Sequence, residues 1–130
     1  MKVNFLIFAL LVIFIGCRQE NEPSGDEIEF YPTITSSEFQ IISPKSGDIW
    51  YINQTYEIKW LPSSKAKFVI IKIFRKNTLK KIISSKTEND GSFFYNVHPD
   101  LESSNLYKIE LSNYNDSTEV VKSNYFSIRQ

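Results

Sequence analysis

Hydrophobic and polar positions alternate along most of the chain after residue 38, with the period of two that half-buried strands show. The clearest stretch has Tyr56, Ile58 and Trp60 alternating with Glu57 and Lys59. The first three side chains are therefore expected to face a core and the charged pair to face water. The pattern, together with many Ile, Val, Phe and Tyr residues, predicts seven strands. These are Phe39–Ile42, Tyr56–Trp60, Phe68–Arg75, Lys80–Lys86, Ser92–Val97, Leu106–Ser112 and Val121–Ile128.

Turn-forming residues separate these strands, and no stretch has convincing helical periodicity. The pair Asp90-Gly91 is typical of a β-hairpin. Short strands at this spacing predict an all-β fold, an immunoglobulin/fibronectin-like β-sandwich of about seven strands over residues 38–130. The Asn89–Gly91 and Asn113–Asp116 turns could also bind calcium weakly, but hairpin turns need no ion.

The segment 68–75 is apolar on nearly both faces. Val69, Ile71 and Ile73 share one face and are expected to point into the core. Ile70 and Phe74 then point outward. Two interpretations stay open for them, because either neighbouring side chains cover them or they form a partner surface.

The N-terminus has the parts of a secretory signal, since Lys2 precedes an apolar run, 5–15, and the small residue Gly16. The run is shorter than the roughly 20 residues that span a bilayer. Gly16-Cys17 after this run resembles a bacterial lipobox, although Phe14 stands where Leu is usual. The resemblance implies a signal peptide over residues 1–16 and lipidation (palmitate-type acyl chains) of Cys17. A plain signal peptide or an uncleaved anchor is the alternative.

Residues 17–37 are expected to be the lipidated cysteine and a flexible acidic tether, rich in Glu, Asp, Pro and Ser. Acidic residues soon after the cysteine resemble the surface-export signals of Bacteroidetes lipoproteins. Together these segments predict a protein whose membrane contact is the lipid on Cys17. Its expected location is the cell envelope, at the outer membrane or the cell surface.

The chemistry-bearing residues are few. The chain has 15 basic and 15 acidic residues, so the basic stripe of a nucleic-acid-binding protein is missing from the sequence. Cys17 is the only cysteine and His98 the only histidine, and carboxylates do not cluster at metal-ligand spacing. No nucleophile-elbow sequence supports a Ser-His-Asp site. We therefore expect no enzyme activity, no metal and no cofactor.

Aromatic residues make up 15% of the chain. Sugar-binding modules stack flat rings on pyranose faces, so four rings expected on outward faces are candidate ligand contacts: Tyr51, Phe94, Tyr114 and Tyr125. The alternative is that small sandwiches are commonly rich in aromatic residues.

Two segments, 42–60 and 90–109, carry a family resemblance. The first holds Ser43-Pro44-Lys45-Ser46-Gly47-Asp48-Ile49-Trp50 and then Tyr56-Glu57-Ile58-Lys59-Trp60; the second holds Asp90-Gly91-Ser92-Phe93-Phe94-Tyr95-Asn96-Val97, Pro99 and Tyr107-Lys108-Ile109. Together they resemble the Ser-Thr-rich GPI-anchored membrane protein family, or yeast Kre/Knh-like cell-wall synthesis N-terminal domain. The resemblance implies an immunoglobulin-like sandwich with an extracellular role, and cell-wall glycan biology in fungal members. It carries over no catalytic residue.

Within that pattern we expect four residues to be structural: Trp50, Trp60, Tyr95 and Tyr107. Tyr107 resembles a tyrosine corner, in which the hydroxyl bonds back to the backbone. Asn53 stands where the family usually has Gly, and Asn is the next-best residue for a left-handed turn. The function expected is a non-catalytic binding or adhesion module for a glycan or an envelope protein. The alternative is a structural or spacer subunit of an envelope or glycan-uptake complex.

Overall fold

A computed structural model describes residues 39–130 of the chain. The predicted signal peptide, Cys17 and the predicted tether lie outside the described residues. Within residues 39–130 the chain forms nine strands and no helix that could span a membrane. The strands are β1 Gln40–Ser43, β2 Ile49–Tyr51, β3 Thr55–Leu61, β4 Phe68–Arg75, β5 Thr78–Glu88, β6 Ser92–Asn96, β7 Ser104–Asn113, β8 Val120–Lys122 and β9 Phe126–Arg129.

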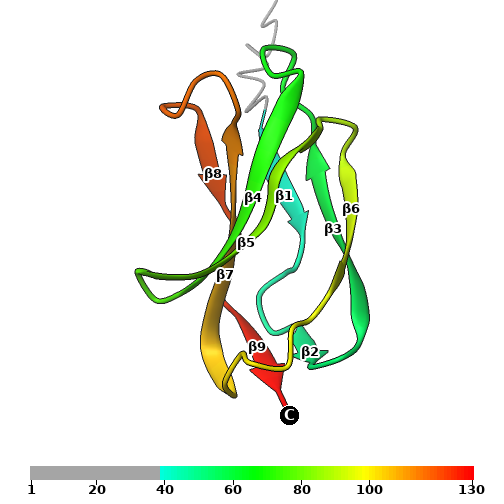
Figure 1. Cartoon of the computed structure of the whole chain (residues 1–130), viewed down its shortest axis with the longest axis vertical. Coiled ribbons are helices and arrows are strands. Elements are labelled where there is room, and N and C mark those ends of the chain that lie inside the picture. The colour runs from blue at the N-terminus through cyan, green and yellow to red at the C-terminus, as the bar shows by residue number, and fades with distance from the viewer. Residues whose placement is uncertain (1–38) are drawn as a thin grey trace, which may run out of the picture. The chain divides into compact units, whose positions relative to one another are not determined.

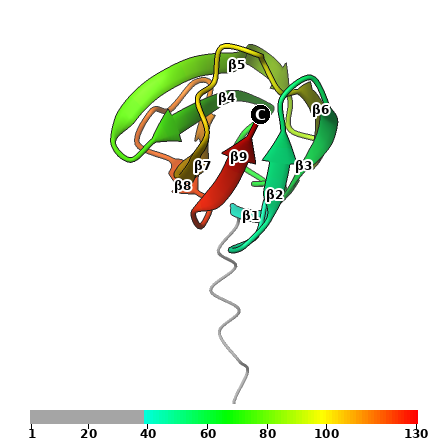
Figure 2. The same cartoon turned by 90° about the horizontal axis from the view of Figure 1, so that it is seen from below.

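The strands form two sheets that face each other (Figures 1 and 2). The smaller sheet has the order β1-β3-β6 and is antiparallel. The larger has the order β2-β9-β7-β4-β5, with β8 also pairing with β7. All of its pairs are antiparallel except β2 with β9. The predicted all-β, immunoglobulin-like sandwich is confirmed.

The core lies between the inward faces of the two sheets, as the alternation predicts. Val69, Ile71 and Ile73 of β4 are fully buried, and so is Ile58 of β3. The buried hydrophobic cluster runs from Trp50 to Ile128, so the described residues supply a complete core by themselves. Residues 35–130 also form a compact unit of their own. We therefore expect this unit to fold without the rest of the chain.

The outward side chains of β4 are half-buried rather than bare. Ile70 and Phe74 both have intermediate exposure. Their backbone partners on β7 are Ser112 and Lys108. Neighbouring side chains on the sheet therefore cover part of both apolar side chains.

The last predicted strand, 121–128, is divided in two. β8 ends at Lys122 and β9 begins at Phe126. The ladder with β7 ends at Ser123. Its N–H still donates to Ile109 O at 2.8 Å, but the Ile109 N–H donates to the Ser123 Oγ at 2.9 Å instead of to a backbone carbonyl. β9 then pairs with β2 as well as with β7, which places Trp50 in a strand that the sequence pattern did not predict.

The prediction of a β-hairpin at Asp90-Gly91 is wrong, because this turn joins β5 of the larger sheet to β6 of the smaller one. Asn89 holds the turn in place. Its Oδ1 accepts from Trp60 Nε1 at 2.7 Å, and its Nδ2 donates to the carbonyls of Ser63 and Ala66 at 2.8 Å.

Gly91 is needed at this turn for two reasons. Its φ is +94°, and an added Cβ would lie 3.0 Å from Trp60 O. The tight hairpin of the larger sheet lies instead between β4 and β5, where Lys76 has a φ of +55°. Asn53 has a φ of +60°, so it takes the left-handed conformation expected of it.

Candidate functional site

The strongest candidate site is the outer face of the smaller sheet, built from the outward side chains of β3 and β6. We call it the Phe94 face. Because strand side chains alternate, the residues facing inward on these strands form the core and the others reach solvent. The members of the face are Thr55, Glu57, Lys59, Ser92, Phe94 and Asn96.

Phe94 stands at the centre of this face. Its side chain is 69% exposed, more than any other exposed large hydrophobic residue within residues 39–130. The neighbours Phe93 and Tyr95 are turned to the inner side, where Tyr95 is 8% exposed. The residue opposite on β3 is Glu57. Phe94 thus presents a largely free ring beside a carboxylate.

Hydrogen-bonded polar groups lie on one side of the ring. Ser92 Oγ donates to Glu57 Oε1 at 2.7 Å, and Lys59 Nζ lies 3.1 Å from Glu57 Oε2. The hydrogen bond from Ser92, followed by that from Lys59, lowers the pKa of Glu57 below its ordinary value. The Glu57 carboxyl is therefore ionised and fixed in position at neutral pH.

A second polar pair lies toward the other end of β6. Asn96 Nδ2 donates to Thr55 Oγ1 at 3.1 Å and also contacts Asn53 O at 3.4 Å. Phe94 therefore lies between two sets of ordered hydrogen-bonding groups. Such a mixture of one aromatic surface and a few fixed polar groups is typical of small-molecule and sugar sites.

A groove adjoins the Phe94 face and shares Glu57 and Lys59 with it. Its volume is about 600 Å³, and its lining combines charged and apolar side chains. The lining residues are Ile42, Ser43, Lys45, Asp48, Ile49, Trp50, Tyr56, Glu57 and Lys59.

One wall of the groove is rigid. Tyr56 stacks on Trp50 with ring centroids 5.0 Å apart and planes 7° from parallel. The Tyr56 hydroxyl accepts a hydrogen bond from the Tyr51 N–H at 3.0 Å. Trp50 is 3% exposed, so Tyr56 is the ring that this stack can present to a ligand.

The other three rings predicted as ligand contacts are exposed but are not gathered at this face. Tyr51, Tyr114 and Tyr125 are 48%, 45% and 45% exposed. Tyr51 lies on β2, Tyr125 just before β9 and Tyr114 just after β7. The turn that follows β7 lies at the end of the sandwich away from β2 (Figure 1).

Lysines also occupy faces of two of these rings. Lys86 Nζ lies 4.7 Å from the Tyr114 centroid and 4.5 Å from that of Phe68, and Lys108 Nζ lies 5.5 Å from the Tyr125 centroid. These cation–π contacts leave Phe94 as the candidate with the freest ring.

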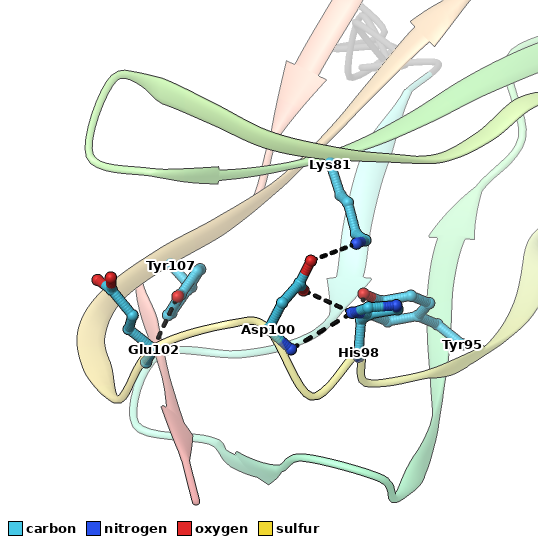
Figure 3. A network of polar contacts seen from close by, with 6 residues as sticks. All are labelled: Lys81, Tyr95, His98, Asp100, Glu102 and Tyr107. Atoms are coloured by element: carbon cyan, nitrogen blue, oxygen red, sulfur yellow. Dashed lines mark hydrogen bonds and ion pairs between the residues drawn. The ribbon is translucent and has the colours of Figure 1, made fainter.

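His98 belongs to a polar network near the loop between β6 and β7 (Figure 3). Its Nδ1 lies 2.6 Å from Asp100 Oδ1, and Lys81 Nζ of β5 lies 2.7 Å from Asp100 Oδ2. The hydrogen bond from Lys81, with His98 contributing less, lowers the pKa of Asp100. The network ties the edge of the larger sheet to the loop that leaves the smaller one.

A His–Asp contact of this kind also occurs in hydrolases, where the histidine activates a hydroxyl. Within residues 39–130, no hydroxyl is hydrogen-bonded to the other ring nitrogen of His98. In the same part of the chain, no three His, Cys, Asp or Glu side chains are grouped to hold a metal ion. The Asn113–Asp116 turn is closed by its own side chains, since Asn113 Oδ1 accepts from Asn115 N–H at 2.9 Å.

The four residues predicted to be structural are buried. Trp50 and Trp60 are 3% and 2% exposed, and Tyr107 is fully buried. The Tyr107 hydroxyl donates to Glu102 O at 2.8 Å, which is a tyrosine corner (Figure 3). The Tyr95 hydroxyl accepts from His98 N–H at 3.4 Å. Burial raises the pKa of both tyrosines, so their hydroxyls stay protonated at neutral pH.

Sequence reasoning missed the polar part of the site. Glu57, Lys59 and Ser92 were expected only to face solvent or to end a strand. Their connection to Phe94 depends on which strand pairs with β3, and alternation alone does not reveal pairing. One signal was available in the sequence: Glu57 and Phe94 each occupy an outward-facing position of their own strand.

The fold has a recognisable family. Residues 43–128 match the model of the Kre9/KNH-like N-terminal Ig-like domain, and the chain belongs to this family. A structure of the fibronectin(III)-like modules of CbhA from Clostridium thermocellum is also similar, with 15% identity and a TM-score of 0.41. That match covers 69% of this chain and 91% of the module. No curated protein matches the chain.

Proposed function

We propose that this protein is a non-catalytic binding module of the cell envelope that holds a polysaccharide against the Phe94 face. The single observation that supports it most is the Phe94 ring, 69% exposed and flanked by ordered polar groups of β3 and β6. Exposing a ring of this size to water is unfavourable, and an aromatic surface beside a few fixed polar groups is typical of ligand sites.

The chemistry of the face fits a sugar. A pyranose ring has an apolar face of C–H groups and a rim of hydroxyls. Phe94 would stack on the apolar face, while Glu57, Asn96 and the neighbouring lysine would bond the hydroxyls. The groove beside Lys59 extends the polar surface and would accept a further sugar unit. Because the groove carries both signs of charge, a neutral glycan suits it better than a strongly charged one.

We also propose that the protein does not hydrolyse the glycan it binds. Glycoside hydrolysis uses two carboxyl groups flanking the scissile bond. On the Phe94 face the one carboxylate is Glu57, and Lys59 and Ser92 already hold it ionised. An ionised, ion-paired carboxylate does not donate a proton, so the face is suited to binding alone.

The proposal also includes attachment to the membrane through lipid on Cys17. Its support is the sequence around Cys17, which lies outside the described residues. The test is expression in a lipoprotein-competent bacterium with labelled fatty acid. The wild-type chain should be labelled and partition into detergent, and Cys17→Ser should do neither. Equal labelling of the two chains would refute the anchor.

Binding is tested with a glycan array on residues 35–130, the compact unit. Phe94→Ala should reduce binding to the preferred glycan at least tenfold, because the stacking surface is lost. Phe94→Trp should keep or strengthen it, since the larger ring still stacks. Tyr114→Ala is the matched control, because this exposed ring follows β7 of the larger sheet, outside the Phe94 face, and its loss should leave binding unchanged.

Three outcomes would count against the proposal. Hydrolysis of any arrayed glycan would overturn the non-catalytic part. Binding that survives Phe94→Ala would remove the proposed platform. No glycan binding, combined with capture of one envelope protein or of none, would favour the spacer or subunit alternative.

A further inference from the structure

The smaller sheet has two edge strands, β1 and β6, and residues 39–130 provide no further strand beside β6. The backbone groups on this side follow from the ladder with β3. Trp60 N–H donates to Gly91 O at 3.0 Å, and Val97 N–H donates to Gln54 O at 2.9 Å. Antiparallel ladders bond every second residue to the same neighbour.

The odd-numbered residues of β6 therefore bond to β3, and the even-numbered ones point away from it. The second set comprises Ser92, Phe94 and Asn96. The Ser92 N–H is already held by Asp90 Oδ1 at 3.1 Å. The N–H and C=O groups of Phe94 and Asn96 face the open side and are ready to pair with another strand.

This edge differs from β5, which forms one of the two edges of the larger sheet. β5 is eleven residues long and carries charged residues along its length, including Lys80, Lys81 and Lys86. Charged edges, lysine above all, prevent edge-to-edge pairing. β6 has the sequence SFFYN and contains no charged residue. Of these two edges, β6 is the one without protection.

We propose that β6 pairs antiparallel with β6 of a second copy of this chain, so that the two smaller sheets become one continuous sheet. The pairing is centred on Phe94, which then faces Phe94 of the second copy. Ser92 faces Asn96 of the second copy, and the reverse pair forms on the other side of the two-fold axis. In this register the two Phe94 residues form a hydrogen-bonded pair, and each Asn96 N–H can donate to Ser92 O of the other copy, since the Ser92 N–H is held by Asp90.

A second copy is the partner we infer, because the β6 edge is complementary to an identical β6 edge. An uncharged strand meets its own copy without like-charge repulsion, whereas β5 would bring lysines together. The two Phe94 rings become a cross-strand aromatic pair, an arrangement that stabilises antiparallel sheets. Beyond the strand ends, Asp90 and His98 each lie four residues from Phe94 along the chain, so this register places Asp90 of one copy opposite His98 of the other.

The interface is small, which predicts a weak dimer with a dissociation constant of roughly 0.1–1 mM. Attachment of both copies to one membrane would raise their effective concentration and favour the dimer. The proposal does not rest on glycan binding. If both proposals are correct, the dimer presents two adjacent rings on one face.

Sedimentation equilibrium of residues 35–130 up to about 1 mM tests the proposal without any glycan. The mass should rise toward that of a dimer. Phe94→Lys, which places two ammonium groups against each other, should raise the dissociation constant at least tenfold. Ile82→Lys is the matched control, because Ile82 is 54% exposed on β5 and its substitution should change nothing. A monomer at all concentrations, or equal effects of the two substitutions, would overturn the proposal.

Amide hydrogen exchange of the unsubstituted protein gives an answer that does not depend on any variant. The Phe94 and Asn96 amides should exchange more slowly as concentration rises, whereas those of Phe93 and Tyr95 should be protected at every concentration. Concentration-dependent protection confined to β5 would contradict the proposal. The β6 amides could instead be protected at every concentration, but only when residues 17–34 are present. That result would identify the chain's own N-terminal segment as the occupant and would overturn the proposed dimer.

Discussion

The inner and outer faces of the smaller sheet use the same kind of residue for opposite purposes. Trp60 on β3 is 2% exposed and Phe94 on the neighbouring β6 is 69% exposed. The two rings belong to strands that pair directly, and only the parity of their positions separates them. The same alternation therefore supplies both features: its inward positions stabilise the core, and its outward positions form the candidate binding surface.

The polar groups of the two faces differ in the same way. On the inner face, Trp60 Nε1 has one partner, Asn89 Oδ1, in a part-buried site. On the outer face, Glu57 has two partners and remains in contact with water. Loss of a partner is costly where water cannot replace it and cheap where water can. This difference sets the order of the effects predicted below.

The largest effect is expected for Trp60→Ala. Truncation of a buried ring leaves a cavity and should cost about 3–5 kcal/mol of unfolding free energy. Since small domains have only about 5–15 kcal/mol in total, the variant should unfold or aggregate at moderate temperature. Phe94→Ala should change the unfolding free energy by less than about 0.5 kcal/mol, as exposed positions usually do. Urea unfolding of both variants measures the contrast.

A well-folded Trp60→Ala protein would contradict the assignment of Trp60 to the core. A Phe94→Ala protein that loses several kcal/mol would show that the ring has a structural role. In that case the argument for Phe94 as a ligand platform would lose its basis.

A smaller effect is expected for Asn89→Ala. This substitution removes the acceptor of Trp60 Nε1 and the donor to the carbonyls of Ser63 and Ala66. Groups left unsatisfied in a part-buried site should lower the unfolding free energy by about 1–3 kcal/mol. Asp90→Ala, one residue further along the turn, is the comparison, because it removes only the exposed hydrogen bond from Ser92 N–H, which water can replace. Thermal unfolding of the two variants should show a lower midpoint for Asn89→Ala, and equal midpoints would refute the role of Asn89.

Much of the fold could be predicted from the sequence because alternation reports burial directly. Val69, Ile71 and Ile73 were assigned to the core on this basis and are fully buried. The motif around Trp50 and Trp60 also indicated the family, and the match over residues 43–128 agrees with it.

The rest depended on pairings that no local pattern encodes. Asp90-Gly91 has the composition of a hairpin, yet Asn89 fixes the turn to three groups of another loop and strand, so the chain crosses between sheets. β2 has three residues, too few for its alternation to be recognised, and it exists because β9 lies beside it. The polar part of the Phe94 face was missed for the same reason, since Glu57 and Ser92 meet only through the β3–β6 register.

The smallest effect is expected for Glu57→Gln on the outer face. Hydrogen bonding from Ser92 and then from Lys59 lowers the pKa of Glu57 in the folded protein below its ordinary value of 4.5. A carboxyl whose pKa is lowered by folding stabilises the protein above its unfolded pKa, and this contribution disappears as the pH falls through the folded pKa. The wild-type protein should therefore be slightly more stable than Glu57→Gln at pH 7, and the two should converge as the pH falls below 4.5 and through the lowered folded pKa. Urea midpoints measured from pH 7 to pH 2.5 give this difference, with Glu88→Gln on the exposed end of β5 as the matched control. A difference that persists unchanged at the lowest pH would mean that the charge of Glu57 does not stabilise the outer face, which would leave shape and hydrogen bonding as the only causes.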